Sequence, residues 1–480
     1  MCMSSCIAHS GVQVKDMAAG VVVAVVLVAL VFIGLWKLLG DSKRDKDFLP
    51  EGDGWWGKGE PSQTPADQTV RPFKVPYSPE TMQDVRRRLA SVRLAEPLEG
   101  SRFHYGFNST YLQRVLKYWA EEFDWECTVA VLNKYPQYIT NIEGIDVHFV
   151  HVRPLGVPES TKPKVLLMTH GWPGSFYEFY KILPLLVEPQ GPGATEVFEV
   201  ICPSIPGYSF SEAPHKQGFN SLCAARLFCK LMERLGHDKY YVQGGDWGSL
   251  IGTNMANMRP WCVKGLHLNF ATVTGGLVRL LPSAVLGPWM PGLFGLTPTD
   301  IKRVFPCTQL LKNVLLESGY MHIQGTKPDT VGVALSDSPA GLAAYILEKF
   351  STWTKRENMD QEDGGLETLF ELDELLCMVM IYWVSGCITS SMRFYKENFS
   401  RNIFKSKDAH MPVWVPTGVA AFPSELVHTP RAWLASKYRS IVSYEYMPRG
   451  GHFAAFEQPL LLAEDVRSFV KKVEELAVLP

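Results

Sequence analysis

Apolar and polar positions alternate in blocks between residues 164 and 270. Short apolar runs typical of buried strands occupy 165–169, 197–201, 240–244 and 263–270, and 221–235 has the spacing of a helix. Strands that alternate with helices predict a parallel sheet with helices on both faces. Ligands on such sheets bind at the carboxyl ends of the strands, so chemistry is expected in the turns after these runs.

A block of different pattern precedes this region. Helices are predicted over 78–90 and 109–123, and alternating stretches at 138–142 and 145–152 predict a hairpin. Residues 71–160 are therefore expected to form an N-terminal extension that wraps on the main body.

The strand–helix alternation stops at residue 271. Residues 271–405 are mostly helical in pattern and rich in aromatic side chains. Strands are then expected at 413–415 and 441–446, followed by a last helix. Because the insertion follows a core strand, we interpret 271–405 as a helical lid between two parts of one core, 161–270 and 406–480.

The first 70 residues differ again. After a tail of residues 1–16, residues 17–36 carry no charge, and 20 residues of helix span about 30 Å, one bilayer core. No signal-peptide cleavage pattern follows, so we expect an uncleaved transmembrane anchor, with 37–70 as a linker. Basic residues are more numerous just after the span than just before it, which predicts that the body faces the cytosol. The sequons at Asn108 and Asn398 should then carry no glycan.

Bulk composition adds exclusions rather than a function. The chain has 480 residues, 46% hydrophobic and 20% charged, as an ordinary globular protein has. Its net charge of -2 gives no support to a nucleic-acid partner. The ten cysteines form no C-x-x-C pair, and His and Cys do not cluster at zinc-ligand spacing. We therefore expect free thiols and no bound metal.

One turn has the pattern of a nucleophile elbow. The run 240–244 leads into Gly244-Gly245-Asp246-Trp247-Gly248, in which small residues flank one polar residue, and a helix is expected over 250–259. The central residue of such elbows is usually Ser, and here it is Asp246. A carboxylate is already ionised at neutral pH and can displace a leaving group at saturated carbon, which gives an alkyl ester.

A base and an orienting acid follow in the chain order of α/β-hydrolases. His452 lies in a Gly-rich turn after the last expected strand. Glu425 is the only carboxylate between 413–415 and His452 other than Glu445, which lies within a strand. We therefore assign His452 as the base that activates water against the ester, and Glu425 as its acid partner. The backbone N–H groups of Trp172 and Trp247 are the expected oxyanion donors.

Taken together, these motifs resemble those of the microsomal epoxide hydrolases. The resemblance covers nearly everything after residue 48, and it also includes the N-terminal anchor. It rests on His170-Gly171-Trp172-Pro173, the Asp246 elbow, Glu425, Gly450-Gly451-His452-Phe453 and lid segments at 317–322 and 392–398. It implies an α/β-hydrolase fold and an enzyme that opens epoxides to vicinal diols without a metal or organic cofactor.

The same resemblance assigns two lid residues. It implies that Tyr320 and Tyr395 hydrogen-bond the epoxide oxygen, whereas the residue pattern alone does not rank them above Tyr345 and Tyr382. It further implies apolar substrates, either arene and alkene epoxides or a lipid epoxide, and a place on the endoplasmic reticulum membrane.

Three alternatives stay open from the sequence. A haloalkane dehalogenase shares the Asp elbow and needs N–H donors for a halide, which Trp172 and Trp247 offer, but it does not need a tyrosine pair. A serine esterase is disfavoured because the elbow has no Ser at its centre. A membrane-tethered binding protein on a retired hydrolase scaffold is disfavoured by the intact nucleophile, base and acid.

Overall fold

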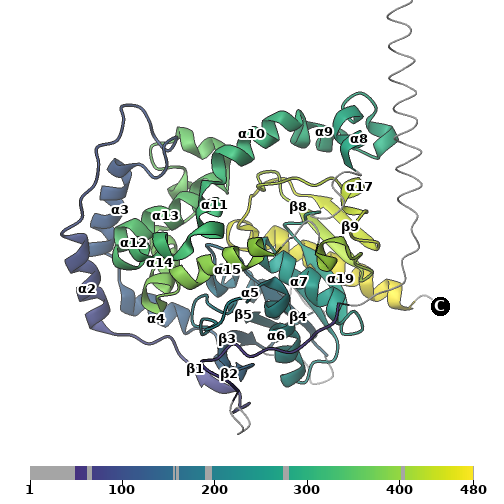
Figure 1. The fold of residues 1–480 in the computed structure, drawn as a ribbon, viewed down its shortest axis with the longest axis horizontal. Coiled ribbons are helices and arrows are strands. Elements are labelled where there is room, and N and C mark those ends of the chain that lie inside the picture. Colours follow the sequence, from purple (N-terminus) through teal and green to yellow (C-terminus); the bar gives the residue numbers. More distant parts are fainter. Residues whose placement is uncertain are drawn as a thin grey trace, which may run out of the picture.

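One nine-stranded sheet forms the centre of the molecule (Figure 1). The computed structural model describes residues 49–61, 67–154, 157, 162–189, 197–273, 280–401 and 406–478. The strand order is β1-β2-β3-β5-β4-β6-β7-β8-β9. Strands β4 to β9 are parallel to one another, and β1, β2 and β3 pair antiparallel with their neighbours. The strands are β1 (Arg71–Phe73), β2 (Gln137–Ile142), β3 (Ile145–Val152), β4 (Lys164–Thr169), β5 (Phe198–Pro203), β6 (Tyr240–Gly244), β7 (Val263–Leu268), β8 (Thr417–Ala421) and β9 (Ile441–Tyr446).

Helices cover both faces of this sheet. Gly252 of α7 (Asp246–Met258) lies against Val242, whereas Phe469 of α19 (Pro459–Val478) lies against Gly265 and the ring of Tyr241. Successive residues of a strand point to opposite faces, so α7 and α19 lie on opposite sides of β6. α6 (Ser221–Arg234) packs beside α7, and α5 (Leu183–Val187) packs beside α19. The predicted α/β-hydrolase architecture is confirmed.

The segment between β7 and β8 is helical and lies over the carboxyl end of the sheet (Figure 1). Two of its helices, α13 and α14, form most of the apolar centre of this layer, with Phe350, Trp353 and Tyr382 fully buried. The helices are α8 (Leu281–Leu286), α9 (Pro298–Val304), α10 (Cys307–Glu317), α11 (Gly319–Thr326), α12 (Pro328–Asp337), α13 (Pro339–Thr352), α14 (Leu372–Ser385), α15 (Ile388–Ser400) and α16 (Lys407–His410).

The N-terminal extension packs on this helical layer as well as on the sheet. Its helices are α2 (Pro79–Leu89), α3 (Ser109–Glu121) and α4 (Trp125–Leu132). Arg88 donates to Asp337 at 2.9 Å, and the Tyr111 hydroxyl donates to Glu367 at 2.9 Å. The extension therefore joins the first strands to the layer above the active end of the sheet.

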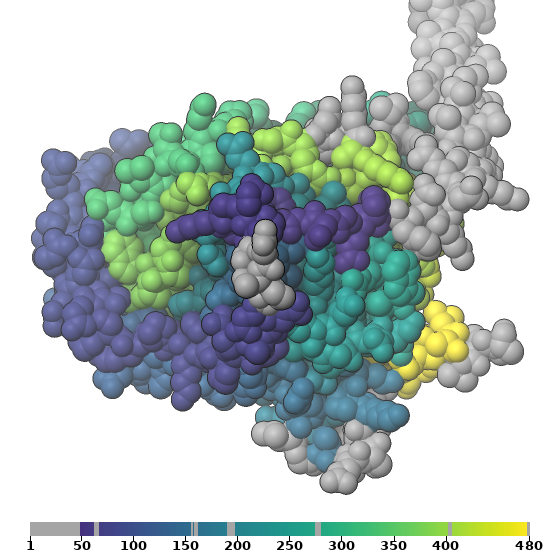
Figure 2. Space-filling view, turned by 60° about the horizontal axis from the view of Figure 1, so that its bottom comes forward, coloured from purple at the N-terminus to yellow at the C-terminus, as the bar shows by residue number. Residues whose placement is uncertain are grey.

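Residues 49–61, within the predicted linker, lie across the surface of the core (Figure 2). Trp56 packs edge-on against Phe219 at 5.0 Å and donates its indole N–H to Glu143 at 2.9 Å. Glu51 pairs with Arg259 at 2.8 Å. This part of the linker is thus fixed to the body.

The predicted anchor, residues 17–36, lies outside the described residues. Within the described ranges, no single helix has the length and apolar character needed to cross a membrane. Two sharply bent pairs, α12–α13 (116°) and α14–α15 (86°), meet those criteria only when taken together.

Two expected elements differ from the structure. Residues 413–415 form only an isolated bridge, between Val413 and Tyr438, and the strand beside β7 is β8, a few residues later. Its sequence, Thr-Gly-Val-Ala-Ala, is short and small, so it lacks the bulky pattern on which the expectation relied. The helix expected from 250 begins at Asp246 itself, because the elbow turn is only one residue long.

Candidate active site

The elbow is built by close contact between two strand ends. β6 ends at Gly244, and Asp246 has φ 47°, in the left-handed region that is strained for a side-chain-bearing residue. A Cβ on Gly248 would lie 2.0 Å from the carbonyl oxygen of Thr169, so only Gly fits there. The strained turn projects the carboxylate of Asp246 from the carboxyl end of the sheet, and 17% of the side chain is exposed.

The turn after β4 holds one oxygen of this carboxylate. The backbone N–H of Trp172 donates to Asp246 Oδ1 at 2.9 Å. Gly171 permits this approach, since a Cβ there would lie 2.2 Å from the same oxygen. His170 fixes the turn rather than facing substrate: its Nδ1 bonds Gly171 O at 3.0 Å and its Nε2 accepts the N–H of Ile205 at 3.1 Å.

His452 lies between two carboxylates. Its Nδ1 is 2.6 Å from Glu425 Oε1, and its Nε2 is 3.6 Å from Asp246 Oδ2. Gly450, with φ 101°, turns the loop after β9 back over the sheet. The backbone N–H of His452 donates to Trp353 O at 3.0 Å, which ties the loop to the helical layer. The structure thus brings together Asp246, His452 and Glu425 from three separate strand ends.

Tyr320 on α11 and Tyr395 on α15 approach this group from the helical layer. Tyr320 stacks on Trp172 at 5.3 Å, Tyr395 packs edge-on against Trp247 at 4.8 Å, and the two tyrosine rings are 5.9 Å apart.

The other two tyrosines that the sequence left unranked have partners elsewhere. The Tyr345 hydroxyl donates to Gln324 at 3.1 Å, and the Tyr382 hydroxyl donates to Gly174 O at 2.9 Å. Of the four, Tyr320 and Tyr395 are the pair whose rings contact each other beside Trp172 and Trp247, the residues on either side of the Asp246 carboxylate in the two turns.

Comparison with known proteins decides the family. Residues 70–179 match the model described as "Epoxide hydrolase N terminus", and residues 164–386 match that of the alpha/beta hydrolase fold. The chain is 56% identical to epoxide hydrolase 1 of Sus scrofa over 90% of this chain and 96% of the relative. It is 45% identical to juvenile hormone epoxide hydrolase 1 of Ctenocephalides felis, over 88% and 90%. The chain belongs to the microsomal-type epoxide hydrolase family.

Solved structures agree with this assignment. The crystal structure of juvenile hormone epoxide hydrolase from Bombyx mori superposes with TM-score 0.85 at 41% identity, covering 89% of this chain and 100% of that one. Epoxide hydrolase of Aspergillus niger superposes with TM-score 0.70 at 29% identity, covering 85% and 97%. The chain is therefore an epoxide hydrolase, and the dehalogenase, esterase and binding-protein alternatives are set aside.

Charge distribution in this epoxide hydrolase sets the protonation of the site. Burial alone would lower the pKa of His452, but the carboxylates of Glu425 and Asp246 outweigh it, and the pKa is held well above its usual range. Burial, followed by the charge of Asp246, raises the pKa of Tyr320. Burial and the neighbouring Tyr320 raise that of Tyr395. At neutral pH the histidine is thus an imidazolium and both tyrosines are phenols.

Sequence reasoning missed two partly buried carboxyls beside this group. Glu178 lines the same cavity as Asp246 and His452, and its Oε1 accepts the N–H of Ser175 at 3.1 Å. Burial raises the pKa of Glu178 to about 8. Glu457 accepts the N–H groups of Gly451 and Phe453, and burial also raises its pKa to about 8. A Ser-x-x-Glu capping spacing at 175–178 was the available signal for the first of them.

Proposed function

We propose that this epoxide hydrolase works through a covalent ester on Asp246. The single observation that supports this most is the position of Asp246: a strained residue has one carboxylate oxygen bound to the N–H of Trp172, and the other, Oδ2, lies on the side of His452, 3.6 Å from its Nε2. Attack by Oδ2 forms an O–C bond, breaks an epoxide C–O bond and leaves the electron pair on the epoxide oxygen. The product is a hydroxy ester.

The proposed proton donors to that oxygen are Tyr320 and Tyr395. Both hydroxyls keep their protons at neutral pH because burial and nearby negative charge raise their pKa values. Two donors from two different helices can hold the oxygen while the developing alkoxide is neutralised. The same arrangement gives the lid a direct part in the first chemical step.

His452 changes role after the first step. The negative charge of Asp246 is one reason for its raised pKa, and esterification removes that charge. The imidazolium then releases its proton through solvent, which restores the proton that Tyr320 or Tyr395 gave to the epoxide oxygen. Neutral His452, oriented by Glu425 through the 2.6 Å contact, can now deprotonate the attacking water.

Hydrolysis of the ester needs donors for the tetrahedral oxyanion. Trp172 N–H already holds Asp246 Oδ1, which becomes the ester carbonyl oxygen. Trp247 lies in the first turn of α7, where backbone N–H groups lack helical partners and the helix dipole favours negative charge. We assign these two N–H groups to the oxyanion hole.

One turnover in heavy-oxygen water tests the ester route. Unlabelled oxygen in the first diol, followed by label in Asp246, supports it, whereas immediate label in the diol would mean direct attack by water. The buried indole N–H groups of Trp172 and Trp247 have no hydrogen-bond partner among the described residues and could bind a halide. Bromide release from a bromoalkane, assayed alongside, therefore measures any dehalogenase activity.

We further propose apolar epoxides as substrates. The site is walled by aromatic rings, with Trp353 5.1 Å from Tyr320 and 4.9 Å from His452. Relatives named juvenile hormone epoxide hydrolase support a lipid epoxide, and the resemblance to the microsomal family implies arene and alkene epoxides as the other candidates. The ratio of kcat/KM for an arene oxide and a terpenoid epoxide separates the two.

Anchoring by residues 17–36 in the endoplasmic reticulum membrane, with the body in the cytosol, is also proposed. It rests on the uncharged stretch and the basic residues after it. Asn398 is buried and bonds the N–H of Ser221, so a bare Asn398 says nothing about orientation. Asn108 is partly exposed, and a glycan there would contradict a cytosolic body.

A further inference from the structure

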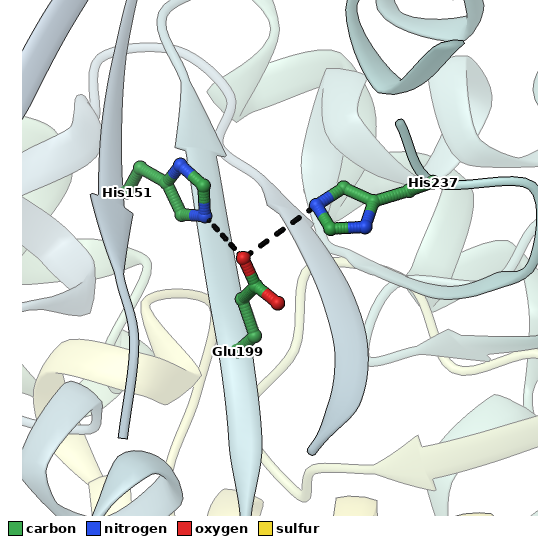
Figure 3. Close-up of side chains that lie close together, drawn as sticks. All are labelled: His151, Glu199 and His237. Atoms are coloured by element: carbon green, nitrogen blue, oxygen red, sulfur yellow. Dashed lines mark hydrogen bonds and ion pairs between the residues drawn. The ribbon is translucent and has the colours of Figure 1, made fainter. Parts of the chain in front are cut away.

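Two histidines and a glutamate converge far from the catalytic group (Figure 3). His151 comes from β3, Glu199 from β5 and His237 from the turn between α6 and β6. His151 Nε2 lies 2.7 Å from Glu199 Oε1, and His237 Nε2 lies 3.6 Å from the same oxygen. One ligand atom from each residue lies within 4.8 Å of the other two.

The sheet explains why these residues meet. His151 pairs with Ile201 across β3 and β5, so Glu199, two residues earlier, lies diagonally on the same face. Glu199 is near the amino end of β5, whereas Asp246 follows the carboxyl end of the parallel strand β6. The cluster therefore lies at the opposite end of the sheet from the active site.

A simple ion pair leaves part of this cluster unexplained. His237 Nε2 is buried and has no hydrogen-bond partner among the described residues, although it points at a carboxylate. Three metal-ligating atoms therefore lie within 4.8 Å of one another, one of them without a hydrogen bond, and this geometry fits a site for a cation.

We propose that His151, Glu199 and His237 bind a divalent transition-metal ion, with Zn²⁺ as the preferred occupant. Two imidazole nitrogens and one carboxylate oxygen are a donor set that zinc favours and that Mg²⁺ and Ca²⁺ do not. Tetrahedral zinc with bonds of about 2.0–2.1 Å needs donors roughly 3.3 Å apart. The 2.7 Å and 3.6 Å separations require only small opening and closing movements.

Two local changes accompany binding. Arg153, which donates to Glu199 Oε1 at 3.0 Å, has 71% of its side chain exposed and can turn to water. The ion also takes the place of the direct 2.7 Å contact between His151 Nε2 and Glu199 Oε1. The ion would tie the antiparallel part of the sheet to the α6–β6 turn, which stabilises the fold without touching the chemistry.

Zinc titration of the chelator-stripped full chain in detergent tests this site. One equivalent of Zn²⁺ should raise Tm, Mg²⁺ should not, and His237→Gln should weaken zinc binding at least about tenfold. His215→Gln is the matched control, because His215 pairs with Glu212 at 2.8 Å without a second histidine. Epoxide turnover by His237→Gln should equal that of the parent, which shows that the variant folds. Zinc affinity unaffected by His237→Gln, or no zinc-dependent change in Tm, overturns the site.

An independent observation concerns the outer surface of the lid. α8, α9 and α10 form an arm along one edge of the molecule (Figure 1), and Cys307 of α10 contacts Ala284 O of α8 at 3.8 Å. α10 has no buried residue. Its Leu311 and Leu315 are 69% and 76% exposed, and Trp289, just after α8, is 76% exposed. Large apolar side chains grouped in this way mark an interaction surface.

We propose that this arm lies in the headgroup region of a lipid bilayer, which rests on the anchor proposed above. An uncharged 20-residue stretch of the same chain supplies the bilayer. Amphipathic helices with Leu and Trp on one face and Lys beside it bind such interfaces, and Lys302 and Lys312 are exposed on the arm. Since α11 and Tyr320 directly follow α10, the arm would place the lid next to dissolved apolar epoxides.

Depth-dependent quenching of tryptophan tests the arm. The full chain is placed in phosphatidylcholine–phosphatidylserine vesicles that carry brominated acyl chains. Trp289→Phe should remove a quenched component, and Trp261→Phe should not, although Trp261 is 55% exposed on the core. Equal loss in both variants, or none in either, overturns the proposal.

Kinetics of the Leu311→Asp/Leu315→Asp variant provide a second readout. KM should rise several-fold for an epoxide dissolved in the vesicles and stay unchanged for a water-soluble one. A changed oligomeric state instead would assign the arm to a second copy of the chain. Equal loss of turnover on both substrates would mean that the substitutions disturb the lid itself, and it would overturn the membrane role of the arm; the proposed function is tested separately by the Asp246 ester.

Discussion

The two ends of the sheet use the same side chains for opposite purposes. At the carboxyl end, His452 lies between Glu425 and Asp246, and its pKa is held well above the usual range. At the amino end, Glu199 lies between His151 and His237, its pKa is lowered to about 2, and that of His237 is lowered. Two carboxylates around one imidazole hold a proton on it, whereas two imidazoles around one carboxylate keep that group ionised and, in the site proposed above, share it with a cation.

The largest expected effect comes from removing the nucleophile at the carboxyl end of the sheet. Asp246→Ala should lower diol formation at least about 10⁴-fold, because the carboxylate that the elbow places beside His452 and the Trp172 N–H is lost. Diol production by chromatography measures this, and Asp238→Ala, an exposed change near the other cluster, is the control. Retained turnover would refute the assignment of Asp246.

Replacing the base should separate the two chemical steps. His452→Gln should slow ester hydrolysis by about 10²–10⁴-fold while alkylation still proceeds, so the ester accumulates. Mass spectrometry of the intact protein after mixing with substrate detects it. If no adduct appears although substrate binds, His452 acts before the ester forms.

The tyrosine pair tests how much the lid contributes to the first step. Tyr320→Phe and Tyr395→Phe should each slow alkylation about 10²-fold, since one donor to the epoxide oxygen is lost. Tyr345→Phe is the matched control, because its ring also packs on Trp172 at 5.7 Å. Stopped-flow fluorescence of a single turnover gives the alkylation rates. Equal effects in all three variants would mean that Tyr320 and Tyr395 are not special donors to the epoxide oxygen.

The raised pKa of Glu178, at the catalytic end of the sheet, should make the free energy of unfolding fall as pH rises. Its pKa of about 8 in the folded chain exceeds the ordinary 4.5, so the folded state keeps a proton that the unfolded state loses. Stability therefore falls as pH rises between these values. Glu178→Gln should lose less stability from pH 5 to 8, by on the order of 1 kcal/mol. Urea unfolding measures it, with exposed Glu126→Gln as control; parallel curves would contradict the shift.

Glu199 should show the opposite sign and a smaller effect. With its pKa near 2 instead of 4.5, the carboxylate contributes stability above about pH 4.5 that is lost as pH falls toward 2. Glu199→Gln should therefore narrow the difference in unfolding free energy between neutral and acid pH by about 1 kcal/mol, because the partner Arg153 is 71% exposed and solvent screens its pairing. Chelated samples exclude metal from this measurement. If the free energy of unfolding at acid pH is the same in the variant and the parent, the bond between Glu199 and His151 does not stabilise the fold.

The sequence predicted an element correctly where its local structure accepts only a few residue types. The glycines around Asp246 predicted the elbow, because a tight turn accepts only small neighbours. The apolar runs of β4, β6 and β7 predicted the parallel sheet, because buried strands need apolar side chains. β8 was misplaced, since five small residues between two helices give no comparable signal.

The sequence by itself determined the order of the core and the family, and it predicted the nucleophile and its base, because these depend on short motifs. Only the tertiary structure separated Tyr320 and Tyr395 from Tyr345 and Tyr382 by their contacts, and only it placed Glu178 in the catalytic cavity. It also brought His151, Glu199 and His237 together, where sequence spacing predicted no metal. The physical reason is that strand pairing and helix packing set distances between residues that no local pattern connects.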